Sequence, residues 1–83
     1  MSPNDIKTLR KRLKLTQKDL SHALGVSKLT MSQYETGFRK PGPTALVLLF
    51  VLATLPLRKA QELTQLLQQA SHRLAVDGED LQK

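Results

Sequence analysis

The sequence predicts an all-α domain built from five helices. Two observations carry this prediction: apolar residues recur at spacings of three and four along most of the chain, and residues that cap or end helices stand between these stretches. A chain of 83 residues can bury one modest core, so a single domain is expected. The absence of cysteine excludes a disulfide framework, a thiolate zinc site and a cysteine nucleophile.

The first three predicted helices are short and closely spaced. The first covers about residues 3–14, with a proline near its start and apolar residues at helical spacing. The second, residues 16–24, opens on a threonine followed three positions later by an aspartate, as in a shortened capping box. Gly25 can adopt the left-handed conformation that ends it, and Ser27 caps a third helix that runs to about residue 36. Two capped helices joined by a tight glycine turn form a helix-turn-helix.

The second half of the chain contains two further predicted helices. Residues 39–43 form a basic connector whose two prolines cannot continue a helix. A fourth helix is expected over residues 44–54 and a fifth, opened by a proline, over residues 56–74. Residues 76–83 lack a periodic apolar face, so we predict a domain of residues 1–75 followed by a flexible tail.

The positive charge of the chain is concentrated in its first half. Residues 1–40 carry nine Lys and Arg against three acidic residues, whereas residues 41–83 carry four of each kind. A polyanion partner of the first half is the simplest interpretation, and a solubilising face is the alternative.

One face of the third predicted helix combines side chains suited to base edges. At about 100° per residue, Met31 and Tyr34 point to the core. The opposite face carries Lys28, Leu29, Ser32 and Gln33. Lysine can reach guanine, glutamine can bond adenine in bidentate fashion, and leucine can pack on a thymine methyl group. We therefore predict that this face contacts DNA bases, with an ordinary solvated face as the alternative.

Phosphate contacts are expected around this helix. The N-terminus of the second helix presents free backbone N–H groups and a positive dipole end, which favour an anion beside Gln17. The predicted phosphate-contacting residues are Gln17, Ser27, Thr30, Arg39 and Lys40. Such contacts fix the register of a protein on DNA without reading its sequence. For Arg39 and Lys40 a merely solvated loop is the alternative.

Residues 6–43 resemble the Cro/Xre-type helix-turn-helix family, which includes phage repressors and many antitoxins. The matching runs are Leu-Thr-Gln at residues 15–17, Ala-Leu-Gly-Val-Ser at 23–27 and Ser-Gln-Tyr-Glu-Thr-Gly at 32–37. The resemblance implies a five-helix, lambda-repressor-like DNA-binding domain and a role in transcriptional regulation. The third run, followed by Lys-Pro-Gly-Pro-Thr and a leucine-rich helix, looks most like antitoxins of the HigA/MqsA type. Such an antitoxin would have a toxin protein as a further partner.

The resemblance also assigns roles to single residues. It implies that Gln17 binds phosphate and that the outward face of the third helix contacts bases. It further implies an ion pair between Arg10 and Glu35 behind that helix. The sequence supports this pairing because Glu35 is the only acidic residue between Asp19 and Glu62.

The last two predicted helices present apolar surface for a partner. The fourth helix is apolar on every side and must be covered all round, which suggests a second subunit. The fifth repeats apolar residues at a 3-4-3-4 spacing suited to helix pairing. We predict a homodimer on an inverted-repeat operator, with an interface that includes Leu48, Phe50, Leu52, Leu63 and Leu67. The alternative is that the fifth helix packs on the fourth within one chain.

Other functions find less support in the sequence. Asp19, Ser21 and His22 lie on different faces of one helix and cannot form a catalytic relay. His22 and His72 stand alone, so neither enzyme activity, a metal site nor a cofactor is expected. One tyrosine and two phenylalanines offer few stacking platforms for RNA. No signal peptide or spanning segment is recognisable, which fits a cytoplasmic protein without a membrane partner. The main rival is a protein-interaction module that binds a toxin or another factor and binds DNA only weakly.

Overall fold

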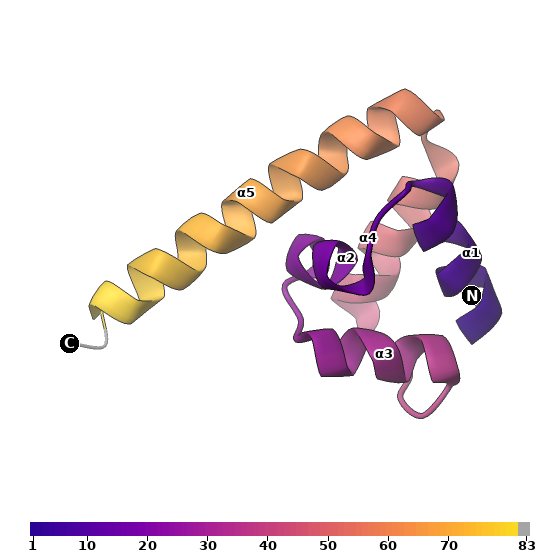
Figure 1. Ribbon diagram of the computed structural model, residues 1–83, viewed down its shortest axis with the longest axis horizontal. Helices are drawn as coiled ribbons and strands as arrows, with labels where there is room; N and C mark the ends of the chain where they lie inside the picture. Colours follow the sequence, from indigo (N-terminus) through magenta and orange to yellow (C-terminus); the bar gives the residue numbers. More distant parts are fainter. Residues whose placement is uncertain (82–83) are drawn as a thin grey trace.

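A computed structural model describes the backbone of residues 1–81 and the side chains of residues 1–74. The described chain forms the helices α1 (Pro3–Arg12), α2 (Gln17–Leu24), α3 (Lys28–Thr36), α4 (Pro43–Thr54) and α5 (Leu57–Leu81), with no strand among them (Figure 1). The predicted all-α class is confirmed. No described helix is both long enough and apolar enough to cross a membrane.

Helices α1 to α3 begin at polar caps, of which the sequence predicts those of α2 and α3. At the start of α1 and of α2, a cap hydroxyl accepts a hydrogen bond from the backbone N–H three residues on, and the aspartate there accepts one from the cap N–H. The Ser27 hydroxyl caps α3 in the same way, accepting from the Thr30 N–H at 3.0 Å. Gly25 and Gly37 end α2 and α3 with φ angles of 72° and 84°, in the left-handed region that glycine adopts without strain.

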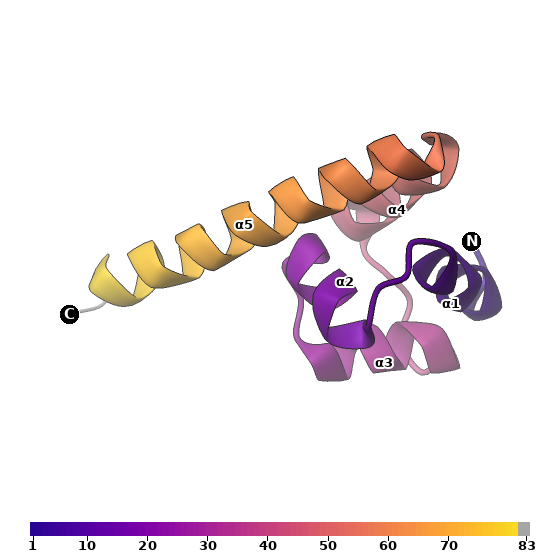
Figure 2. The same ribbon diagram turned by 45° about the horizontal axis from the view of Figure 1, so that its top comes forward.

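The core draws apolar side chains from all five helices. Met31 and Tyr34 of α3 are buried, as predicted. The buried apolar set comprises Ile6, Leu9, Leu13, Leu20, Ala23, Leu24, Met31, Tyr34, Ala45, Leu49, Leu52 and Ala60. Helix α3 packs on α1 and α2, and it lies on the side of the molecule opposite α5 (Figures 1 and 2).

Helix α4 buries one face and leaves the other uncovered. Its buried face carries Ala45, Leu49 and Leu52, whereas Val47 and Phe50 are exposed. The prediction that Leu52 lies in a dimer interface is wrong, because its side chain is 0% exposed within the core of its own chain. The sequence of a helix that is apolar on every side does not indicate which face is buried, because tertiary packing determines that face.

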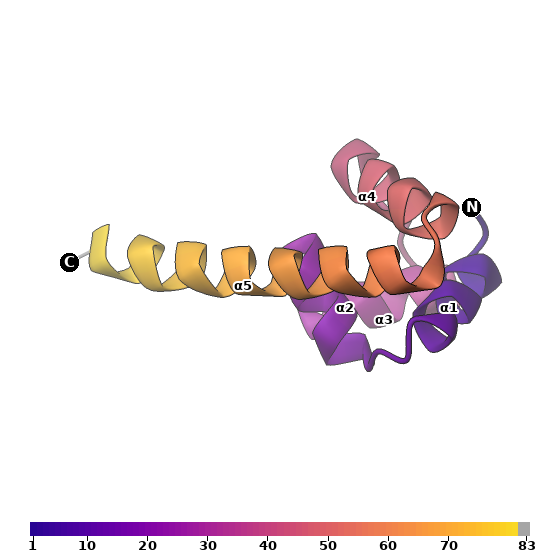
Figure 3. The same ribbon diagram turned by 90° about the horizontal axis from the view of Figure 1, so that it is seen from above.

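Helix α5 packs mainly along α2 rather than along α4. In Figure 3, α5 crosses α2, whereas α4 and α5 diverge from the short segment that connects them. Leu63 and Leu67 are half-buried against the chain's own core, which already covers part of their surface. The alternative to the dimer, that the fifth helix packs on the fourth within one chain, therefore holds only in small part. The predicted helix end near residue 74 is too early, since the backbone stays helical to Leu81. The flexible tail predicted for residues 76–83 extends to residues 82 and 83, which lie outside the described residues, and its flexibility stays a prediction.

Candidate nucleic-acid interface

Helix α3 presents its predicted reading face to solvent. Lys28 is exposed, Ser32 and Gln33 are half-buried, and the Leu29 side chain is 68% exposed. The packing of α3 on α1 and α2 uses the opposite face, so these four side chains all remain accessible. The arrangement offers a cation, an apolar group, a hydroxyl and a carboxamide on one helix, each with a partner on a base edge.

The predicted phosphate contacts flank this face. Ser27 and Thr30 lie at the start of α3, where the Ser27 hydroxyl donates to the Thr30 Oγ1 at 2.9 Å. Arg39 and Lys40 are exposed in the loop that follows α3. The Arg39 N–H donates to the Gln33 carbonyl at 3.2 Å, so this loop is hydrogen-bonded back to α3.

Gln17 at the start of α2 is partly engaged within the protein. Its Nε2 donates to Glu35 Oε1 at 3.4 Å, and its side chain is half-buried. The contact holds the carboxamide beside the first turn of α2, where the backbone N–H groups of the helix end favour an anion.

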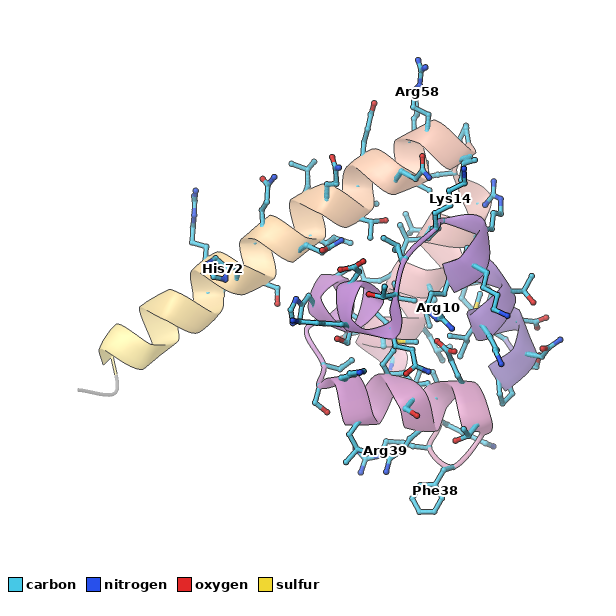
Figure 4. The ribbon with its side chains drawn as sticks, in the orientation of Figure 1. Arg10, Lys14, Phe38, Arg39, Arg58 and His72 are labelled. Atoms are coloured by element: carbon cyan, nitrogen blue, oxygen red, sulfur yellow. The ribbon has the colours of Figure 1, made fainter. Side chains whose placement is uncertain are left out.

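An ion pair between Arg10 and Glu35 joins α1 to α3. Arg10 Nε lies 2.7 Å from Glu35 Oε2, and Arg10 Nη2 lies 3.1 Å from Glu35 Oε1, a bidentate geometry. Arg10 Nη1 also donates to the Leu15 carbonyl at 3.0 Å, in the turn between α1 and α2. The Glu35 side chain is 3% exposed, and Figure 4 shows Arg10 within the α1–α3 body. One guanidinium therefore fixes three segments relative to one another.

The described side chains include no group of three His, Cys, Asp or Glu that could hold a metal ion. His22 and His72 are both exposed.

The sequence of the chain was compared with those of known protein families. A sequence model of the helix-turn-helix family HTH_3, the Cro/C1 type, matches residues 6–51. The chain belongs to this family. Its members are DNA-binding regulators, so the chain contains a DNA-binding helix-turn-helix domain. Neither curated proteins nor solved structures gave a significant match to the chain.

One residue of this helix-turn-helix domain escaped the sequence analysis. Phe38 lies in the α3–α4 loop, residues 37–42, and its side chain is 80% exposed. Figure 4 shows it pointing away from the body, at the same end of the molecule as Arg39. Periodicity could not find it, because a loop residue has no place in a helical pattern. Its position between a helix-ending glycine and two cations was the available signal.

Proposed function

We propose that the protein is a dimeric transcriptional repressor that inserts α3 into the major groove of an inverted-repeat operator. The observation that carries the proposal is the accessible face of α3, with Leu29 and Gln33 one helical turn apart on it. Lys28 lies on the same helix, and Arg39 and Lys40 follow in the next loop. A leucine side chain left in water beside a carboxamide has a natural place in a groove, against a thymine methyl group and an adenine.

In this proposal the residues divide into readers and anchors. Lys28, Leu29, Ser32 and Gln33 contact base edges. Gln17, Ser27, Thr30, Arg39 and Lys40 contact phosphates. The ion pair between Arg10 and Glu35 positions α3 and touches no DNA. Anchors set the register and readers supply the sequence preference.

The uncovered face of α4 supports the dimer. Val47, Phe50 and Val51 recur at i, i+3 and i+4 and are exposed together. A second copy of the chain seated on this face would bury all three twice, once in each subunit. Leu48, half-buried beside them, completes the face, whereas Leu63 and Leu67 contribute only the surface that α2 leaves free. The two copies of α3 would then lie about one DNA turn apart, roughly 34 Å.

We further propose that the repressor is the antitoxin of a toxin–antitoxin pair and represses its own promoter. The Tyr-Glu-Thr-Gly run at residues 34–37 and the proline-rich segment after it support this subtype. Co-expression with the product of the neighbouring gene tests it: rescue of growth from that product supports the antitoxin role, and no rescue contradicts it.

The decisive experiment is a titration of the purified protein against its own promoter and against scrambled DNA, at two salt concentrations. Tight, promoter-specific binding supports a sequence-reading regulator. Equal, weak, salt-sensitive binding to both DNAs would instead favour the protein-interaction module, for which the apolar face of α4 is the available surface.

Two variants with matched controls assign the roles. Gln33→Ala should weaken the free energy of operator binding by about 1–3 kcal/mol and relax the preference at one base pair. Gln65 is an exposed glutamine on α5, so Gln65→Ala should leave both the binding free energy and the preference unchanged. Arg39→Ala should weaken binding to all sequences and reduce the salt slope by about one. Arg58→Ala is its control, because Figure 4 places Arg58 at the far end of the molecule from Arg39. An unchanged operator preference in Gln33→Ala would remove that residue from the reading surface.

A further inference from the structure

Phe38 is the most exposed large apolar side chain among the described residues. Single exposed apolar residues are common on protein surfaces and by themselves need no explanation. This one differs because it lies in the loop that leaves the C-terminal end of the proposed reading helix and points away from the protein (Figure 4).

The loop holds Phe38 in this position by several contacts. Gly37 adopts φ 84° immediately before it, and the Arg39 N–H donates to the Gln33 carbonyl immediately after it. A Cβ atom placed on Gly37 would lie 3.2 Å from Pro3 Cγ, so the loop also lies close against the start of α1. The backbone on both sides of Phe38 is therefore fixed to α3 and α1, and its exposure does not come from a slack chain.

A partly open cleft lies beside the loop, and Phe38 is not among the residues that line it. The cleft has a volume of about 320 Å³, with the apolar residues Pro3, Ile6, Tyr34 and Leu46 in its lining. Arg39 also lines this cleft. Burial of a phenylalanine side chain is worth about 1.5–3 kcal/mol. The Phe38 side chain, 80% exposed, obtains little of this burial free energy within its own chain.

The charges next to Phe38 in the sequence favour a polyanion as its partner. Arg39 and Lys40 follow it directly, and the sequence has no acidic residue between Glu35 and Glu62. The charge of Glu35 itself is matched by Arg10. An apolar protein partner would meet one ring surrounded by cations, whereas DNA offers both phosphates for the cations and apolar sugar surface for the ring.

We propose that Phe38 packs on the deoxyribose rings at the minor-groove edge of the DNA backbone that borders the groove occupied by α3. This inference rests on the proposed function. A loop that follows a helix lying in the major groove passes over the bordering backbone, where Arg39 and Lys40 reach phosphates. Beyond the phosphates lie the sugars, and phenylalanine is among the apolar side chains that proteins place at the minor groove. Phe38 would add affinity that salt does not screen.

Salt dependence separates this role from electrostatics. Phe38→Ala should weaken promoter binding about 5- to 20-fold, as expected for the loss of part of an aromatic side chain's burial. The slope of log K against log salt should stay at the wild-type value, because no counterion is released by an apolar contact. Arg39→Ala, one residue away, should reduce that slope by about one. Phe38→Leu should retain most of the affinity.

Hydroxyl-radical footprinting supplies the direct readout, because it reports the exposure of individual sugars. Wild type should protect a few sugars next to each half-site, and Phe38→Ala should lose this protection while keeping the rest of the footprint. The melting temperature should not fall, since the side chain is largely exposed. Unchanged affinity and footprint in Phe38→Ala, or a reduced salt slope, would overturn the inference and leave the repressor proposal standing. Absence of specific binding by wild type would overturn both.

Discussion

Helices α1 to α3 and helices α4 and α5 are stabilised by different means. The first three each start at a side-chain cap, and one arginine joins α1 to α3. Helix α4 starts at Gly42 without a side-chain cap and is almost entirely apolar. The charge of the chain follows the same division, with an excess of cations in residues 1–40 and balance in residues 41–83. The first region is specified largely by polar contacts, whereas the second depends on burial and leaves the apolar side chains Val47, Phe50 and Val51 exposed, the surface proposed above for a second subunit.

The largest expected effect comes from breaking the polar connection in the first region. Arg10→Ala leaves the Glu35 carboxylate buried without its cation and the Leu15 carbonyl without its donor. Loss of one partner of a buried ion pair costs about 3–5 kcal/mol of unfolding free energy, measurable by urea denaturation. Lys11→Ala, an exposed cation next to it, should stay within about 0.5 kcal/mol of wild type. A loss below about 1 kcal/mol in Arg10→Ala would show that the first region does not depend on this pair.

The second prediction concerns the apolar surface of the second region. Phe50, 53% exposed on α4, is replaced by glutamate, which should weaken self-association about 100-fold because a charge would be buried twice in a two-fold interface. Sedimentation across a concentration series measures this. Leu74→Glu serves as the control, since Leu74 is exposed on α5 away from the α4 face. If wild type stays monomeric throughout the series, or if only Leu74→Glu dissociates the dimer, α4 is not the interface.

A pair of substitutions tests whether helix caps separate the two regions. Thr16→Ala removes the hydroxyl that accepts from the Asp19 N–H and should lower the unfolding free energy by about 1 kcal/mol. Gly42→Ser adds a cap to α4, where a new Cβ has open space, and should raise it by a few tenths of a kcal/mol. Thermal unfolding of both variants is sufficient. Changes in unfolding free energy of the same size and sign in Thr16→Ala and Gly42→Ser would contradict the difference in capping between the two regions.

The smallest expected effect is the pH dependence of the cap of α1. Hydrogen bonds from the backbone N–H and the side chain of Ser2 lower the pKa of Asp5 below its ordinary value of 3.8. Because the folded-state pKa is depressed, the stabilisation is complete above about pH 3.8 and is lost as the pH falls through the folded pKa. Asp5→Asn cannot titrate there, so its difference in melting temperature from wild type should narrow over this range. A difference independent of pH would show that the charge of Asp5 contributes nothing.

The sequence was sufficient for the first region because its signals are local. Thr16 and Asp19 are three residues apart, and Gly25 and Gly37 end helices by their own backbone freedom. The ion pair between Arg10 and Glu35 spans 25 residues, so it was implied by the family resemblance, with modest support from the isolated position of Glu35 among the acidic residues.

Tertiary packing decided what the sequence pattern could not. The apolar run of α4 has no polar face to orient it, so Leu52 was assigned to an interface although it lies in the core. The seam of α5 predicts that some helix covers it, and the identity of that helix, α2, follows from the fold. Phe38 follows no periodic pattern, so only the structure places it at the proposed DNA surface.

The hydrogen bond from the Arg39 N–H to the Gln33 carbonyl has a thermodynamic consequence. Together with the guanidinium contacts of Arg10, it orders the reading helix and its following loop before any ligand arrives. If α3 binds an operator as proposed, that binding requires no coupled folding of this surface. The heat capacity change measured by calorimetry should correspond to the apolar area buried at the contact alone, without the larger negative value that accompanies folding upon binding.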